Sequence, residues 1–148
     1  MSGYSSEIAR YQLIAFAIAA APPVYMLVIL VMKLSGALPE NGFVEFPADI
    51  APLISLALLG AGVVAPLTSF FLKPVLMARQ RQSSTPPGRF HVALVSMALS
   101  ESGAVLGLVL MLMTGNLLYG GLLCGLSFAI TCFHIPGRHW LAFGGATQ

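Results

Sequence analysis

The stretch ALVSMALSESGAVLGLVLMLMTG, residues 93–115, decides the fold class of this chain. It is apolar almost throughout, and it exceeds the length of about 20 residues that an α-helix needs to cross the hydrocarbon core of a bilayer. One acidic residue, Glu101, lies close to its middle. The stretch therefore predicts a membrane-spanning helix with a carboxyl group near the bilayer midplane.

The rest of the chain has the same character. Only 8% of its 148 residues are charged, whereas soluble domains carry about 25%. Four apolar runs are long enough to span a bilayer, and they lack the alternation of barrel strands. They cover about residues 12–32, 50–72, 91–113 and 117–135. We therefore expect an all-α, integral membrane four-helix bundle that forms a single domain over residues 1–148.

The basic residues predict how this bundle is oriented. They gather in the two tails and in the connection 73–90, whereas the connection between the first two runs carries acids. The basic residues of the tails and of this connection are Arg10, Lys73, Arg79, Arg81, Arg89 and Arg138. The other connection has one lysine at its margin, Lys33, and three acids, Glu40, Glu45 and Asp49. Because basic residues favour the cytoplasmic side, we expect both termini and the basic loop 73–90 to be cytoplasmic. The expected location is the inner or plasma membrane of the cell.

Glu101 is an ionisable residue at a depth where a charge is energetically unfavourable. It lies about ten residues, or ~15 Å, along a span that crosses a ~30 Å core. A charged carboxylate at that depth costs about 2.5–3.5 kcal/mol, and such residues commonly serve a function. The cost falls when the group carries a proton. Two interpretations stay open: Glu101 binds and releases a proton, or it only fixes helix packing through hydrogen bonds to Ser100, Ser102 or Thr68.

Small residues recur every three or four positions in two of the runs. They are Ala93, Ser96, Ser100, Gly103 and Gly107 in the third run, and Gly62, Ala65 and Ser69 in the second. Such stripes let membrane helices approach closely. We expect these two helices to pack as an antiparallel hairpin, with Glu101, about 100° around the helix from the stripe, pointing toward a third partner.

Prolines inside two runs predict kinks. Pro22, Pro23 and Pro66 each remove a backbone donor and crowd the preceding turn. The kinks belong either to a broken helix that lines a transport site or to ordinary packing.

Several classes of site are not expected. His134 and His139 are five residues apart and lack the i,i+4 spacing of a helical metal site. The chain has no nucleophile motif, no glycine-rich phosphate loop and no pair of acids suited to hydrolysis. The scattered charges do not indicate nucleic-acid binding. We therefore expect no catalytic activity, no metal and no cofactor.

Residues 50–113 resemble the helical hairpin of the proton-translocating c subunit of rotary ATP synthases. In that family a polar cytoplasmic loop with an Arg-Gln-Pro element joins two membrane helices, and the second helix carries a mid-membrane acid. Here SMALSESGAVLGLVLML, residues 96–112, is similar to that second helix, and Glu101 falls on the proton-carrying position. The loop ARQRQSSTPPG, residues 78–88, contains two Arg-Gln pairs, although its prolines come later.

The chain also departs from that family. The stretch LLGAGVVAP, residues 58–66, retains Gly60 and Gly62 where the family has a longer run of alternating glycines. Two further helices flank the hairpin, and these would obstruct the packing of a simple ring.

The resemblance implies proton or ion translocation with Glu101 as the carrier and Ser100, Ser102 and Gly103 shaping its access. The expected partners are the lipid bilayer and other membrane subunits or a second copy of the chain. The first alternative is a non-catalytic accessory subunit of a larger membrane complex, such as a respiratory one. The second is a small transporter or channel with the prolines as hinges.

Overall fold

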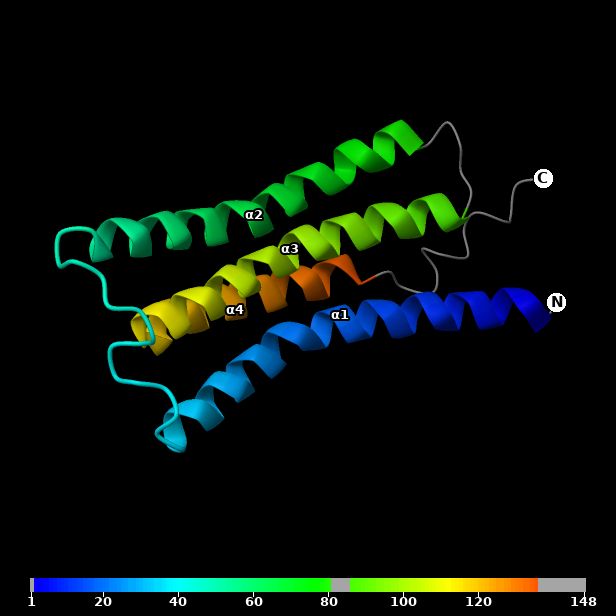
Figure 1. Ribbon diagram of the computed structural model, residues 1–148. Helices are drawn as coiled ribbons and strands as arrows, with labels where there is room; N and C mark the ends of the chain where they lie inside the picture. Colours follow the sequence, from blue (N-terminus) through cyan, green and yellow to red (C-terminus); the bar gives the residue numbers. More distant parts are fainter. Residues whose placement is uncertain (1, 81–85, 136–148) are drawn as a thin grey trace.

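The computed structural model describes residues 2–80 and 86–135, and all regular secondary structure in these residues is α-helical (Figure 1). The helices are α1 (Ser2–Leu34), α2 (Ala51–Gln80), α3 (Pro86–Thr114) and α4 (Leu117–His134). Each of the four contains a segment long and apolar enough to cross a membrane. The predicted all-α, membrane-spanning architecture is therefore confirmed, and the four apolar helices indicate an integral membrane protein.

Helix α3 is the centre of the bundle. It packs against each of the other three helices, and α4 also packs against α1 and α2. Helices α1 and α2 make little contact with each other. In Figure 1, α1 and α2 lie on opposite sides of α3, and α4 lies behind it. Successive helices run antiparallel, so α2 and α3 form the predicted hairpin. This arrangement leaves one face of α3 uncovered between α1 and α2.

The outward surfaces of the helices are apolar. Large apolar side chains are exposed on every helix, including Leu13 on α1, Phe71 on α2, Val95 on α3 and Leu122 on α4. In water such a surface would drive association, whereas in a bilayer it contacts lipid.

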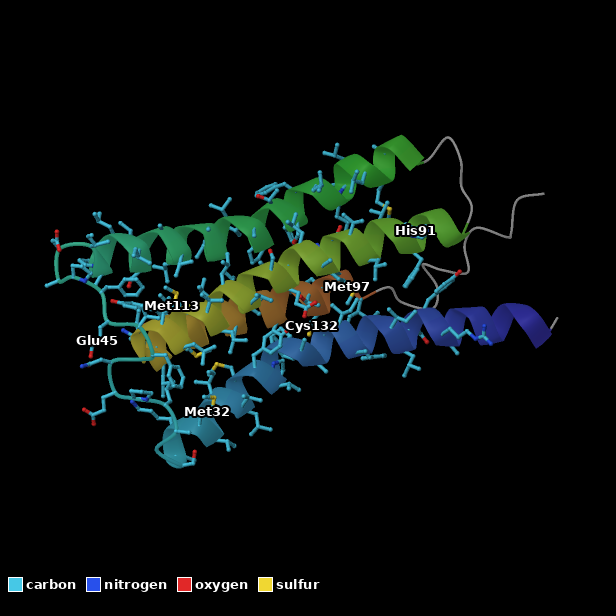
Figure 2. All side chains as sticks on the ribbon, viewed as in Figure 1. Met32, Glu45, His91, Met97, Met113 and Cys132 are labelled. Atoms are coloured by element: carbon cyan, nitrogen blue, oxygen red, sulfur yellow. The ribbon has the colours of Figure 1, made fainter. Side chains whose placement is uncertain are left out.

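The connection 35–50 closes one end of the bundle. Its Phe43 N–H donates to the Leu112 carbonyl at 2.8 Å, which ties it to the end of α3. Gly42 and Gly115 have φ values of +80° and +66°, and a side chain on either would collide with the backbone of the facing segment. Asn116 then caps α4, because its side-chain oxygen accepts from the N–H groups of Leu118 and Tyr119. Figure 2 shows Glu45 and Met113 together at this end.

The helices extend beyond the predicted spans. Residues 73–90 were expected to form a loop, but α2 continues to Gln80 and α3 begins at Pro86. The sequence after Pro74 is rich in good helix formers, and proline is well tolerated in a first helical turn. Two of the basic residues used to predict the orientation, Arg81 and Arg138, lie outside the described residues, in the segments 81–85 and 136–148.

The prolines bend the helices without interrupting them. Both α1 and α2 remain helical through Pro22, Pro23 and Pro66. Figure 1 shows α1 changing direction near its middle. Pro22 and Pro66 are buried. The kinks therefore belong to helix packing and not to a broken helix.

Candidate functional site

Glu101 lies in the middle of α3 on the face that the other helices leave open. The candidate span of α3 runs from Phe90 to Thr114, so about half of it lies on each side of the carboxyl group. The residue is half-buried. Of the chain's five acidic residues, only Glu101 falls inside an apolar run; the others precede α1's apolar part or lie between α1 and α2.

One hydrogen bond holds this carboxyl group. The Tyr25 hydroxyl on α1 donates to Glu101 Oε1 at 2.9 Å. Tyr25 follows the two prolines of α1 by less than one turn, in the part of the helix that packs on the core residues Ile29 and Cys124. The acid thus joins α1 to α3 near mid-span. No second hydrogen bond and no ion pair to Glu101 occurs among the residues that the structure describes.

The carboxyl group lines an open, mostly apolar groove. Its lining residues all come from one face of α3, and its volume is about 450 Å³. They are Ala98, Glu101, Ser102, Val105 and Leu106, which we call the α3 groove. Ala98 and Val105 are exposed, and the other lining residues are half-buried. A molecule in this groove would meet apolar side chains and a carboxyl group.

The opposite side of α3, which we call its packed face, carries the small residues predicted from the sequence. Ala93, Ser96, Ser100, Gly103 and Gly107 are all buried. A Cβ atom on Gly103 would lie 2.5 Å from Pro66 Cγ and 2.6 Å from the Gly62 carbonyl oxygen of α2. A Cβ atom on Gly107 would lie 2.8 Å from the Gly120 carbonyl oxygen of α4. The small residues therefore allow both α2 and α4 to approach the backbone of α3.

The small residues predicted on α2 also face into the bundle. Gly62 and Ser69 are buried and Ala65 is half-buried. A Cβ atom on Gly62 would lie 2.7 Å from Leu123 of α4. The α2 stripe thus packs on α4 as well as on α3, which the sequence did not indicate.

Hydroxyl groups on the packed face bond to α4. Ser100 Oγ donates to the Ser127 carbonyl at 3.1 Å and accepts from Thr131 Oγ1 at 3.0 Å. All three residues are fully buried. Ser96 Oγ donates to the Val92 carbonyl within its own helix at 2.9 Å. The two bonds of Ser100 therefore stabilise the α3–α4 contact, and neither Ser96 nor Ser100 lines the groove.

The predicted hydrogen-bond partners of Glu101 were wrong. Ser100 bonds to α4, Ser102 Oγ donates to the Leu99 carbonyl at 2.6 Å, and Thr68 Oγ1 donates to the Val64 carbonyl at 2.8 Å. Serine and threonine in helices commonly bond to their own preceding turn, so sequence proximity does not make them partners of an acid. Tyr25 was missed, although it is the only side chain with a hydroxyl group in the apolar run of α1 after Tyr11.

A second polar contact lies toward the end of the bundle that holds the start of α3. His134 on α4 is 1% exposed, and its Nε2 lies 3.2 Å from the Ser69 carbonyl of α2. A neutral imidazole that donates from Nε2 presents Nδ1 as an acceptor. Nδ1 has no partner among the described residues. The described residues contain no group of three or more His, Cys, Asp or Glu side chains that could hold a metal.

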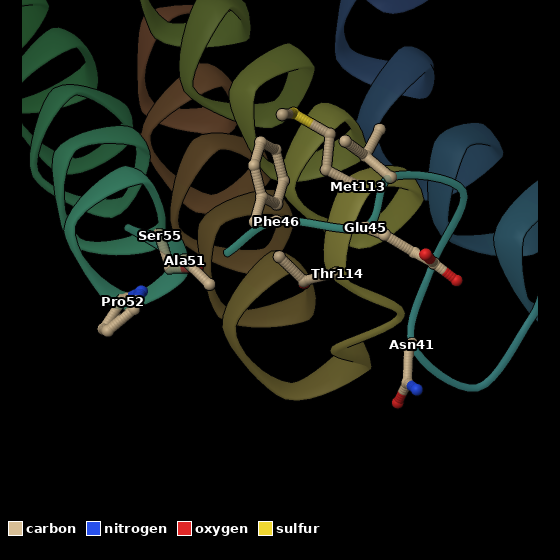
Figure 3. A pocket seen from close by; sticks show the side chains of 9 residues that line it. Asn41, Glu45, Phe46, Ala51, Pro52, Ser55, Met113 and Thr114 are labelled. Carbon is tan, nitrogen blue, oxygen red and sulfur yellow. The ribbon is translucent and has the colours of Figure 1, made fainter. Parts of the chain in front are cut away.

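A pocket of about 530 Å³ lies at the opposite end, where the acidic connection crosses the start of α2 (Figure 3). In Figure 3 the Glu45 carboxylate points away from the Phe46 ring and outward from the helices. Phe46 and Met113 lie on the side of the pocket nearest the bundle. The pocket is open and combines carboxylate and apolar groups from a loop, so it defines no particular chemistry.

We find no family model, no curated protein and no solved structure that matches this chain at a significant level. The resemblance to the ATP synthase c subunit therefore stays a prediction. The site has to be interpreted from its own geometry: a mid-span carboxyl group with one tyrosine donor, on the open side of the central helix. Such a group can bind a proton or a monovalent cation.

Proposed function

We propose that this chain is a proton- or ion-handling subunit of a membrane assembly, and that Glu101 takes up and releases the proton. The proposal rests chiefly on the location of the carboxyl group, in mid-span and in an open groove along one face of α3. An acid needed only for packing would be expected to lie among the buried hydroxyl groups of the packed face. Its ionised form in lipid needs a counter-cation or water, so exchange of a proton is the simplest chemistry open to it.

The two ends of the bundle differ in a way that supports an orientation. Arg10 lies in the first half of α1 and Lys73 in the second half of α2, toward the same end of the bundle in Figure 1. Glu40, Glu45 and Asp49 lie in the connection at the other end. We place the end with Arg10 and Lys73 on the cytoplasmic side, together with both termini, because basic residues are retained on that side.

The hairpin α2–α3 is the part of the chain that would act like a c subunit. It carries the acid on the second helix, about 100° around the helix from the small-residue stripe. However, α4 covers that stripe through the close approach of Gly107 and Gly120. The stripe is therefore used within the chain, and contacts to other subunits would have to use other surfaces, such as the uncovered side of α3.

Labelling with a hydrophobic carbodiimide in native membranes tests the proposal. Carbodiimides add to protonated carboxyl groups, and a lipid-soluble one reaches groups that open to the bilayer. We expect Glu101 to be modified when the reagent is applied at pH values from about 5 to about 8, because carbodiimide reacts with the protonated acid. Glu101→Gln removes the label, whereas Glu40→Gln, which changes an acid of the connection, keeps it. An unlabelled wild-type chain across this range would contradict the proposal.

A second function is favoured by the hydrogen bond from Tyr25. A carboxyl group that joins α1 to α3 at 2.9 Å can serve packing alone. The chain would then be an accessory subunit in which Glu101 never changes its protonation. This alternative predicts full function of Glu101→Gln in cells, since glutamine also accepts the tyrosine hydrogen bond.

A further inference from the structure

We propose that the α3 groove binds a lipophilic organic cation, which exchanges with the proton on Glu101. The inference deepens the proposed function and rests on it. The ligand is a bulky monovalent cation whose charge is delocalised or shielded by apolar groups. The argument combines three observations: a carboxyl group with one neutral donor and no ion pair among the described residues, the apolar lining of the groove, and the direction from which the groove is open.

The carboxylate has room for a counter-ion. Its Oε1 accepts from Tyr25, and Oε2 has no partner among the described residues. Tyr25 is a neutral donor and does not compensate the charge. Lys73, a basic residue inside a candidate span, reaches the Phe133 carbonyl of α4 at 3.5 Å. An ionised Glu101 therefore calls for a cation from outside the described part of the chain.

The groove restricts which cations fit. Apart from the carboxyl group its only polar side chain is Ser102, whose hydroxyl donates to the Leu99 carbonyl. A metal ion would lack the several oxygen ligands that replace its hydration shell. A bulky organic cation needs no such shell and gains from contact with Ala98, Val105 and Leu106. The volume of about 450 Å³ falls within the range of small-molecule sites.

Access to the groove comes from the side. The lining residues lie on the uncovered face of α3, and the neighbouring exposed side chains of the bundle are apolar. A ligand that enters there must partition into the bilayer. The exchange is balanced as a protonated carboxyl group plus the cation giving the carboxylate–cation pair plus one released proton. Proton and cation thus compete for the same oxygens.

Tetraphenylphosphonium is the probe that tests this site. With the full chain in lipid nanodiscs, we expect saturable binding at about one cation per chain, with one proton released for each cation bound in weak buffer. Glu101→Gln should weaken binding by about tenfold or more, because the charge pair is lost. Val105→Trp should also weaken it by filling the groove, while Leu122→Trp, on the exposed side of α4, should leave it unchanged.

The outcomes separate the two proposals. Binding that is equal in wild type and Glu101→Gln is partition into the lipid and overturns the cation site. Saturable binding that survives Glu101→Gln but is lost with Val105→Trp also overturns it, because the carboxylate would then play no part. Absence of binding, with carbodiimide still labelling Glu101, overturns the cation site and leaves proton exchange standing. Absence of both contradicts both proposals.

Discussion

The two sides of α3 face different surroundings, although they belong to the same apolar helix. The packed face is lined by small residues, is fully covered by α2 and α4, and satisfies its hydroxyl groups within the protein. The α3 groove is lined by medium-sized apolar residues, remains open, and carries the acid with one donor. One side thus stabilises the bundle, whereas the other carries an acid that is joined to α1 by a single hydrogen bond and opens to the groove. The contrast separates residues needed for stability from those proposed for function.

Replacing the acid gives the largest expected effect on function and a small one on stability. Glu101→Gln should abolish carbodiimide labelling and proton release, because an amide neither reacts nor titrates. The unfolding temperature in detergent should change little, since the amide oxygen still accepts from Tyr25. A strongly lowered unfolding temperature of the Glu101→Gln variant would show that the acid is needed for stability, and the two sides of α3 would then not differ in the way described.

Adding a methyl group to the packed face gives the largest expected effect on stability. Gly103→Ala should destabilise the bundle by about 1–3 kcal/mol, because the new Cβ atom would overlap Pro66 and the Gly62 backbone. Gly60→Ala on α2 is the matched control, as nothing lies within 4 Å of its added Cβ atom. Equilibrium unfolding in mixed detergent measures both. Equal stability of the two variants would mean that α2 and α3 are not in close contact at Gly103.

Alanine substitutions of two neighbouring serines compare the contributions of the two sides of α3 to stability. Ser100→Ala removes two hydrogen bonds to α4 and should cost about 1 kcal/mol, whereas Ser102→Ala removes only a bond within its own helix and should cost close to nothing. The same unfolding experiment applies. A larger loss for Ser102→Ala would reverse the assignment of the faces.

Removing the tyrosine hydrogen bond should affect stability less than removing the two bonds of Ser100. Tyr25→Phe should cost about 0.6 kcal/mol, the average of hydrogen bonds between membrane helices. Carbodiimide should still label Glu101 in this variant, because the acid and the open groove beside it are unchanged. Loss of labelling in Tyr25→Phe would show that tyrosine is needed to present the acid.

Local sequence patterns were sufficient to predict some of these features. Length and hydropathy predicted four helices, and the spacing of Ser96, Ser100, Gly103 and Gly107 predicted a close contact of α3. Both the lipid-facing and the protein-facing sides of a membrane helix are apolar, so hydrophobic periodicity does not tell which neighbour covers which side. The contact of α4 with the packed face and the approach of Tyr25 to Glu101 depend on the rotation and tilt of whole helices. Neither leaves a local pattern in the chain.

The measurement that bears most directly on the central claim is infrared difference spectroscopy of the protein in lipid while the pH is changed over the whole range in which the protein stays folded. Proton exchange at Glu101 predicts a carbonyl band of a protonated carboxyl group that disappears as the pH rises, is missing in Glu101→Gln and persists in Glu40→Gln. A spectrum in which wild type and Glu101→Gln change identically would show that the carboxyl group keeps one protonation state. Proton exchange would then be ruled out, and the acid would be a packing residue.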